Sequence, residues 1–335
     1  MAGTTRRALL AALGATTSTW VSAAAAWPHF GRAAAVQPAW PRRHVRVIVP
    51  YPPGGATDAT ARIIFAKLSE NLGRAFYIEN RSGASGTLGE AIVAKSAYDG
   101  YTLLHDATAF SVNGSLYHKL PFDYGRDFVP VFLVSEAPAI LVVTPSVPVK
   151  TVDELISLAK SSKDGIDMAS AGFGTLPHLC LEMFKYKAGI TVHHVPYRGG
   201  SQALNDVMSG LVKYCFGSAV TAAGLIKSGK LRGLAHTWKG QLTGLPDIPP
   251  ISETLPGFEA LDWNGVFVRH GTPVMVVQKL NAGLNAALAT PQVSARYAQL
   301  NIQSRQNTSE DFQFFVEKQM TYWGGVVKEL SITVG

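Results

Sequence analysis

Pro50-Tyr-Pro-Pro-Gly-Gly-Ala-Thr-Asp58 and Ser170-Ala-Gly-Phe-Gly-Thr-Leu-Pro-His178 are two glycine-rich turns, each of which joins an apolar strand to the start of a helix. Glycine lets the chain turn sharply and leaves peptide N–H groups uncovered. The first turn of a helix adds free N–H donors and the positive end of the helix dipole. Two such helix starts that face each other would hold an anion, most simply a carboxylate.

Strands, turns and helices alternate around both glycine turns. Before Pro145 we expect strands at 45–49, 75–78 and 101–104, with helices at 59–72 and in the residues before Ser96. After Pro148 the pattern restarts at a capping box that begins with Thr151. There we expect strands at 166–169, 192–195, 211–216 and 231–235, with helices at 152–160, 177–187, 201–209 and 221–228. This alternation predicts an α/β fold in which mostly parallel, partly mixed sheets are flanked by helices.

The final part of the chain completes the first group of elements. We expect a proline-rich stretch at 245–257 to lead the chain back to the first group of elements. A strand at 263–268 and helices at 273–289 and 309–329 are expected to follow. We therefore expect two lobes, with residues 44–144 plus 258–335 in lobe 1 and residues 145–257 in lobe 2. The two crossings between the lobes suit hinge closure around a ligand.

The N-terminal residues 1–35 have the pattern of a secretory signal peptide. They contain three arginines and no acidic residue, followed by a weakly apolar stretch and runs of alanine at potential cleavage sites. A membrane anchor is the weaker alternative, because the apolar part is short for a membrane span. We expect a cleaved signal and a periplasmic protein; the pair Arg6-Arg7 leaves both the Sec and the twin-arginine route open.

Charge and motifs exclude several classes of protein. The net charge is +7, but the charges are scattered and no basic run interleaved with aromatic residues suggests nucleic-acid binding. The sequence has no phosphate-binding loop, no zinc motif and no completed Gly-x-Ser-x-Gly motif. We therefore expect no cofactor, no metal and no enzymatic activity.

Cysteine and histidine residues give no metal-ligand pattern. Cys180 and Cys215 are predicted to be two separate buried thiols, with a single disulfide as the alternative in an oxidising compartment. The adjacent His193 and His194 lie on a strand and point to opposite faces, so we expect one to be buried and one exposed.

The candidate ligand-binding residues lie in three turns. They are Tyr51, Pro53, Gly54, Gly55, Ala56, Thr57 and Asp58 in the first, Ser170, Ala171, Gly172, Phe173, Gly174, Thr175 and His178 in the second, and Tyr197 and Arg198 in a third. Several have a structural alternative. The glycines turn the chain in any α/β protein, Thr57 or Asp58 can cap the helix, and Arg198 is either a carboxylate partner or a surface arginine. If Asp58 is functional, it faces a ligand ammonium group or an ordered water.

The order of these motifs resembles the Tct/Bug family, the periplasmic receptors of tripartite tricarboxylate transporters. The matching segments extend over almost the whole chain after the signal. They include the first turn, Glu79-Asn-Arg-Ser-Gly-Ala-Ser-Gly86, Asp99-Gly-Tyr-Thr-Leu-Leu104, Leu120-Pro-Phe-Asp123, Ser170-Ala-Gly-Phe-Gly-Thr175 and His194-Val-Pro-Tyr-Arg-Gly199.

The resemblance implies a two-lobed Venus-flytrap fold of the type II-like class that binds a small organic anion between its lobes. It implies that the loops at 51–58 and 170–175 hold a ligand carboxylate through backbone amides, hydroxyls and water. The ligand would be a di- or tricarboxylate, an amino acid or an aromatic carboxylate, and the partners would be two transporter subunits in the inner membrane.

Some segments depart from the family pattern. Gly217-Ser218 follows Cys215-Phe216 where an Asp or Asn is common, and Ala235-His-Thr-Trp238 replaces a usual Ala-Val-Thr-Ser segment. If Phe110, Phe173 and Trp238 reach the cleft, an aromatic or bulky acid becomes a plausible ligand.

Two other functions remain as alternatives to a transport receptor. The first is a ligand-binding input for a sensor kinase, which keeps the same cleft and changes the partner. The second is a secreted serine hydrolase or related enzyme that uses Ser85 or Ser170 with a histidine such as His178. The incomplete nucleophile motif disfavours the hydrolase.

Overall fold

The computed structural model describes residues 40–334, so the predicted signal at 1–35 lies outside the described residues. No helix within 40–334 is long and apolar enough to cross a membrane. The strands are β1 (Val45–Val49), β2 (Phe76–Asn80), β3 (Thr102–Ala107), β4 (Phe128–Val143), β5 (Ile166–Ser170), β6 (Val192–Pro196), β7 (Tyr214–Ser218), β8 (Arg232–His236) and β9 (Leu261–Arg269). The α-helices are α1 (Ala56–Leu72), α2 (Thr87–Ala94), α3 (Ala109–Leu116), α4 (Val152–Ser161), α5 (Leu176–Ala188), α6 (Gly200–Ser209), α7 (Ala219–Lys227), α8 (Val274–Leu288), α9 (Pro291–Gln299) and α10 (Ser309–Glu329), and the 3₁₀ turns are η1 (Ala84–Gly86) and η2 (Ile251–Glu253).

The strands form a mixed nine-stranded sheet in the order β2-β1-β3-β9-β4-β7-β5-β6, with β8 also paired to β4. β1 is parallel to β2 and β3, and β5 is parallel to β6 and β7. The four remaining pairings all involve β4 or β9 and are antiparallel. The prediction of a mixed α/β sheet is confirmed, but the expectation of mostly parallel strands is wrong, because half of these eight pairings are antiparallel.

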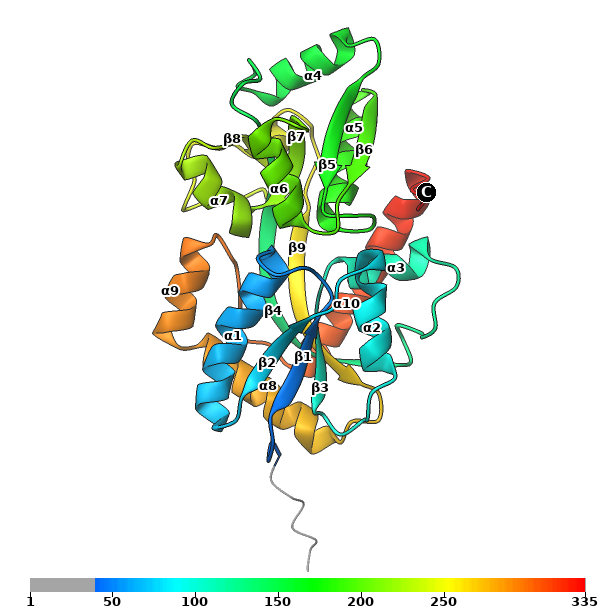
Figure 1. Cartoon of the computed structure of the whole chain (residues 1–335), viewed down its shortest axis with the longest axis vertical. Coiled ribbons are helices and arrows are strands. Elements are labelled where there is room, and N and C mark those ends of the chain that lie inside the picture. Colours follow the sequence, from blue (N-terminus) through cyan, green and yellow to red (C-terminus); the bar gives the residue numbers. More distant parts are fainter. Residues whose placement is uncertain (1–39, 335) are drawn as a thin grey trace, which may run out of the picture. The chain divides into compact units, whose positions relative to one another are not determined.

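Strand β4 connects two groups of strands. Its first part pairs with β9, and its last residues, Ala139–Val143, pair with β7; Figure 1 shows β4 and β9 running from the β1–β3 group to the β5–β8 group. The sequence did not predict this strand. Its last residues are buried on both faces and read as a continuous apolar run rather than an alternation, while Pro130 and Pro138 argue against a central strand.

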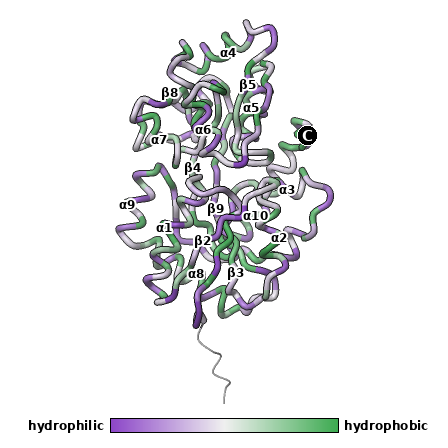
Figure 2. Tube along the Cα trace, in the orientation of Figure 1, coloured by the Kyte–Doolittle hydropathy of each residue, from purple (hydrophilic) through white to green (hydrophobic). Residues whose placement is uncertain are grey.

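Alternate residues of the strands pack on opposite faces of the sheet. In β1, Val47 packs with apolar residues of α1 and α8, whereas Ile48 packs with residues of α2, α3 and α10. In β4, Leu141 packs towards α4 and α5, whereas Ile140 packs towards α6 and α7. The covering helices are amphipathic, as the alternating hydrophobic and hydrophilic stretches of α4 in Figure 2 show. Helices therefore cover both faces, as predicted.

Two short helices and one strand boundary differ from the sequence expectations. Helices α3 (eight residues) and α9 (nine residues) were not predicted. The strand expected at 211–216 lies at Tyr214–Ser218, since Gly210 and Leu211 belong to the turn that ends α6.

Both cysteines are buried and unpaired, as predicted. Burial raises the pKa of the Cys215 thiol to about 12, so this thiol is unreactive at neutral pH. His193 is exposed, and its Nε2 lies 2.5 Å from the Asp164 carbonyl. His194 lies on the opposite face and is half-buried, so the two rings separate as expected but neither is fully buried.

The two glycine turns use left-handed backbone conformations that only glycine adopts easily. Gly54 has a φ of +80° and Gly174 a φ of +69°. A Cβ on Gly54 would have nothing within 4 Å, whereas a Cβ on Gly174 would lie 2.9 Å from Asn113 Oδ1 and 3.0 Å from Leu116 Cδ1. The second turn is therefore constrained by packing as well as by its backbone.

We expect Gly174→Ala to destabilise the protein more than Gly54→Ala. The change at Gly54 adds backbone strain of about 1–2 kcal/mol, and the change at Gly174 adds a steric clash of about 1–3 kcal/mol to the same strain. The free energies of unfolding of both variants, measured by urea denaturation, test this difference. Equal losses would show that the contacts of Gly174 do not constrain the turn.

Candidate functional site

Both glycine turns line one pocket of about 60 Å³, which we call the central pocket. Its walls come from elements far apart in the sequence. They are Tyr51, Pro52, Gly55, Ala56, Thr57, Ala107, Ala109, Ala171, Thr175, Leu176, Pro177, Gly199, Gly200, Ser201, Phe216, Gly217, Ser218, Thr221 and Asp262. Six of the predicted site residues are in this set: Tyr51, Gly55, Ala56, Thr57, Ala171 and Thr175.

Five helices begin at the central pocket. The residues at or next to the starts of α1, α3, α5, α6 and α7 line it. The N-cap residues of these five helices are Gly55, Thr108, Thr175, Gly199 and Ser218. None of them accepts a hydrogen bond on its side chain from a backbone N–H group of its helix. Each helix start carries roughly half a positive elementary charge. The helix starts therefore contribute positive potential to the pocket, although no basic side chain lines it.

Unbonded peptide N–H groups are available in two of these helix starts. The N–H groups of Gly55, Ala56 and Thr57 in α1, and of Gly200 and Ser201 in α6, donate no hydrogen bond to any residue within 40–334. Buried peptide donors need an acceptor from water or a ligand. An anion in the pocket would supply that acceptor.

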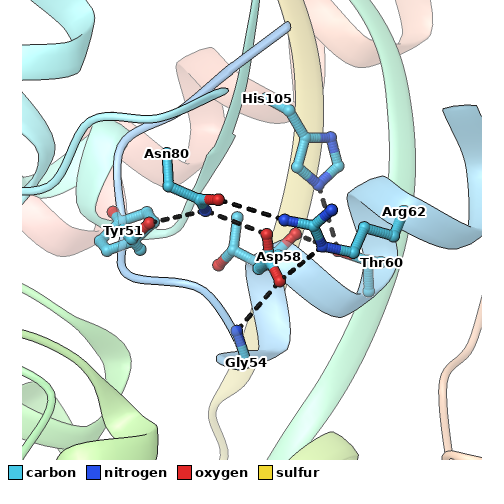
Figure 3. Close-up of polar contacts among 8 residues, drawn as sticks. Tyr51, Gly54, Asp58, Thr60, Arg62, Asn80 and His105 are labelled. Atoms are coloured by element: carbon cyan, nitrogen blue, oxygen red, sulfur yellow. Dashed lines mark hydrogen bonds and ion pairs between the residues drawn. The ribbon is translucent and has the colours of Figure 1, made fainter. Parts of the chain in front are cut away.

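Asp58 holds the first turn in shape (Figure 3). Its Oδ2 accepts hydrogen bonds from Gly54 N (3.0 Å) and Arg62 Nε (2.9 Å), and its Oδ1 accepts one from Asn80 Nδ2 (2.9 Å). Asn80 also donates to the Tyr51 carbonyl (2.9 Å). Burial alone would raise the pKa of Asp58, but these hydrogen bonds outweigh it and hold the pKa below its usual value. Asp58 therefore braces the turn and does not line the central pocket.

Thr57 is positioned by a polar network that connects α1 to two strands. Asn264 Nδ2 in β9 donates to Thr57 Oγ1 (3.3 Å), and Asn264 Oδ1 accepts from Thr60 Oγ1 (2.9 Å). His105 Nε2 in β3 lies 3.1 Å from Thr60 Oγ1 (Figure 3). Burial lowers the pKa of His105 to about 3, so this ring is neutral. Because Thr57 Oγ1 accepts here, its proton is free to be donated into the pocket.

The second turn uses its own side chains to satisfy its glycine N–H groups. Gly172 N donates to Ser170 Oγ (3.0 Å), and Gly174 N donates to His178 Nδ1 (3.2 Å). Thr175 Oγ1 donates to the Gly172 carbonyl (2.6 Å). Burial, then His194 and Lys185, lower the pKa of His178 to about 3, which keeps its Nδ1 an acceptor. The expectation of uncovered N–H groups therefore fails at Gly172 and Gly174, as it does at Gly54 in the first turn.

A second hollow of about 190 Å³, which we call the side pocket, shares Tyr51 and Ala171 with the central pocket. Four more of the predicted site residues line the side pocket: Gly172, Phe173, Tyr197 and Arg198. Gly54 lines a separate hollow beside α6, α7 and α9. The remaining predicted residues, Pro53, Asp58, Ser170, Gly174 and His178, line none of these three hollows.

Neither of the two serines considered for a hydrolase pairs with His178. His178 is bonded to Gly174 N, and Ser85 Oγ accepts from Tyr117 OH (3.0 Å). Ser170 Oγ instead lies 2.6 Å from His194 Nε2, and this serine is fully buried and lines neither the central nor the side pocket.

The three aromatic residues considered as ligand contacts lie in different parts of the structure. Phe110 is 1% exposed and stacks on Phe267 with ring centroids 4.1 Å apart, so it is a core residue. Trp238 lines neither pocket, and Phe173 lines the side pocket. The aromatic residues that line the central pocket are Tyr51, which was predicted, and Phe216, which the sequence analysis did not assign to the site.

Several pocket residues were missed from the sequence. Gly199, Gly200 and Ser201 line the central pocket. The sequence shows the glycines of this turn but not that the turn lies beside the other two. Asp262 and Asn264 lie on β9, about 90 residues from the second turn, and no local motif marks them. Only the sheet topology brings β9 beside the start of α1.

A buried pair of acids lies behind the Tyr51 wall. Tyr51 OH donates to Asp106 Oδ1 (3.1 Å) and Tyr124 OH donates to Glu90 Oε2 (2.5 Å). Glu90 Oε1 and Asp106 Oδ2 are buried and have no hydrogen-bond partner within 40–334. Burial, then the charge of Asp106, raise the pKa of Glu90 well above its usual value, and burial raises the pKa of Asp106 to about 7. Burial and the proximity of the two acids therefore favour their protonated forms.

We expect stability to fall as the pH rises from about 4 to above 7, and Glu90→Gln to weaken this dependence. A carboxyl whose pKa is raised in the folded state contributes stability that is complete below its unfolded pKa and is lost as the pH rises through the folded pKa. Glutamine keeps the size and polarity of the side chain and removes its titrating proton. Unfolding free energies from pH 5 to 8 test this, with the exposed Glu70→Gln as control. Equal pH slopes for Glu90→Gln and the wild type would contradict a raised pKa at Glu90.

Comparisons with known proteins agree with the resemblance drawn from the sequence. Residues 60–332 match the sequence model of a family described as "Tripartite tricarboxylate transporter family receptor". Protein BugT of Bordetella pertussis is 33% identical over 293 residues, which cover 87% of this chain and 90% of BugT. The R. palustris structure of Rpa4515 with adipate is 33% identical with a TM-score of 0.85, covering 88% of this chain and 99% of that one. MatC from Rhodopseudomonas palustris with bound malate is 32% identical with a TM-score of 0.81, covering 86% of this chain and 99% of that one.

These matches confirm the family, the α/β periplasmic binding protein fold, and a role in binding rather than catalysis. The chain belongs to the Tct/Bug family, the solute-binding receptors of tripartite tricarboxylate transporters.

Proposed function

We propose that this receptor binds a small organic carboxylate in the central pocket. The observation that carries the proposal is the convergence of five helix starts without side-chain caps on one pocket. Peptide N–H groups and helix dipoles of this kind bind carboxylates and phosphates without a basic side chain. The relatives solved with adipate and malate support a dicarboxylate or a similar small acid as the ligand class.

The contacts we assign to the ligand come from the first of the predicted turns and from one further helix start, that of α6. The free N–H groups of Gly55, Ala56 and Thr57, with the Thr57 hydroxyl, form one side. Gly200 and Ser201 of α6 contribute donors from another side. The turns are kept in shape by Asp58, Ser170, His178 and the glycines Gly54, Gly172 and Gly174. A ligand that extends into the side pocket would meet Tyr197 and Arg198.

We propose that the chain has two lobes that close on the ligand. Residues 44–144 plus 258–335 form lobe 1, residues 145–257 form lobe 2, and β4 and β9 are the crossings. The central pocket supports this division, because its wall residues come from both ranges. This is the Venus-flytrap arrangement of the type II-like class, in which the ligand shifts an open–closed equilibrium.

We propose that the protein is exported, that residues 1–35 are removed, and that the closed form delivers its ligand to inner-membrane transporter subunits. The family supports this partnership. The signal pattern of the first 35 residues supports export to the periplasm.

Binding of a carboxylate is expected to raise the melting temperature of the protein. A ligand present at about a hundred times its Kd stabilises the folded state by about 2.7 kcal/mol. Thermal-shift assays followed by calorimetry should use mono-, di- and tricarboxylates, amino acids and aromatic acids, with uncharged amides of the same acids as controls. A protein that no acid in this panel stabilises would contradict the proposal.

Gly199→Ala is expected to weaken ligand binding about tenfold without lowering the melting temperature of the free protein. The φ of Gly199 is −179°, an extended conformation that any residue adopts. However, an added Cβ would lie 2.9 Å from Pro52 Cδ and 3.0 Å from Pro52 Cγ, across the central pocket wall. Overpacking of this kind costs about 1–3 kcal/mol. Under the two-lobe proposal the closed form bears this cost, because Pro52 and Gly199 belong to different lobes.

Gly224→Ala in α7 is the matched control, because nothing lies within 4 Å of its added Cβ. Calorimetry of both variants with the best ligand of the panel gives the comparison. Unchanged affinity in Gly199→Ala would show that the contact between Pro52 and Gly199 is not part of the closed form.

A further inference from the structure

Asp262 is the one charged side chain in the wall of the central pocket as the structure describes it. It lies on β9, and its Oδ1 accepts a hydrogen bond from Thr108 Oγ1 (2.6 Å) at the start of α3. This contact fixes the carboxyl group beside the pocket. Its second oxygen, Oδ2, accepts no hydrogen bond from any side chain within 40–334 and forms no ion pair there.

A fixed carboxylate is unexpected in a pocket for a plain dicarboxylate. Like charges at short distance repel, and burial removes the water that would screen them. No lysine, arginine or histidine lines the central pocket to offset Asp262, and the Glu90–Asp106 pair behind Tyr51 adds further negative charge. Burial raises the pKa of Asp262 to about 6, which is the behaviour of a buried carboxyl group without a cationic partner.

We propose that Asp262 selects a ligand that carries an ammonium group beside its carboxylate, an amino acid rather than a plain dicarboxylate. The ligand carboxylate would lie at the free N–H groups of α1 and α6, and its ammonium group would meet Asp262 Oδ2. The proposal rests on the proposed carboxylate function and names its ligand class.

The remaining pocket wall suits a small ligand of this kind. Ala107, Ala109 and Phe216 provide apolar surface for a short hydrocarbon chain. The pocket volume of about 60 Å³ restricts the ligand to a small molecule. Buried polar groups in such a pocket favour the ligand that pairs with them and reject the analogue that leaves them unpaired.

The test compares pairs of ligands that differ only in the amino group. Calorimetry measures the affinities for aspartate against succinate and for glutamate against glutarate, at pH 7.5, for the wild type and Asp262→Asn. We expect the wild type to prefer the amino member by at least about tenfold. In Asp262→Asn the affinity for the amino member should fall by about ten- to a hundredfold, while that for the plain acid stays equal or rises.

Glu136→Gln is the matched control, because Glu136 lies on β4 opposite Trp263, next to Asp262, and lines neither pocket. It should leave the preference unchanged. If Asp262→Asn does not fold, the preference of the wild type within each pair decides the question.

Two results would overturn the proposal. The first is a wild type that binds the plain acids as tightly as the amino members. The second is an Asp262→Asn variant that changes both affinities equally, because Asp262 would then only support the start of α3. Absence of binding for every carboxylate would instead overturn the proposed function, and this inference with it.

Discussion

Peptide N–H groups at the start of a helix have no acceptor within the helix, and this constraint underlies the site described above. At the central pocket five helices begin without a cap from the N-cap side chain. Glycine occupies two of these N-cap positions, Gly55 and Gly199, and contributes no side-chain acceptor. The uncapped donors and the helix dipoles together offer an anion-binding site without basic residues, and an incoming anion would complete the hydrogen bonding.

Such a site works only if its turns are rigid, because a displaced donor loses its hydrogen bond. The structure fixes them with side chains that do not line the central pocket. Asp58 holds the first turn through Gly54, Arg62 and Asn80, and His178 holds the second through Gly174. These residues had been expected to meet the ligand, and their polar groups are instead used within the protein. Their role in binding is to position the turns.

Acidic side chains also lie at fixed positions around the pocket, in addition to the positive ends of the helix dipoles. Glu90 and Asp106 are buried behind Tyr51, and Asp262 lies in the wall itself. The helix starts favour an anionic group of the ligand, whereas the carboxyl group of Asp262 on β9 favours a cationic one. This pattern gives a physical basis for discrimination among acids that all satisfy the helix starts equally.

The sequence by itself determined the family, the α/β alternation and the two turns on which the pocket is built, because glycine turns, helix starts and strand periodicity are local properties. It did not determine β4, whose continuous apolar run and prolines obscure a strand that is buried by both groups of elements. It also did not reveal Asp262, Asn264 or the start of α6 as parts of the site. Their proximity depends on antiparallel pairing of β9 with β3 and β4, a long-range arrangement that is decided only when the packed sheet forms.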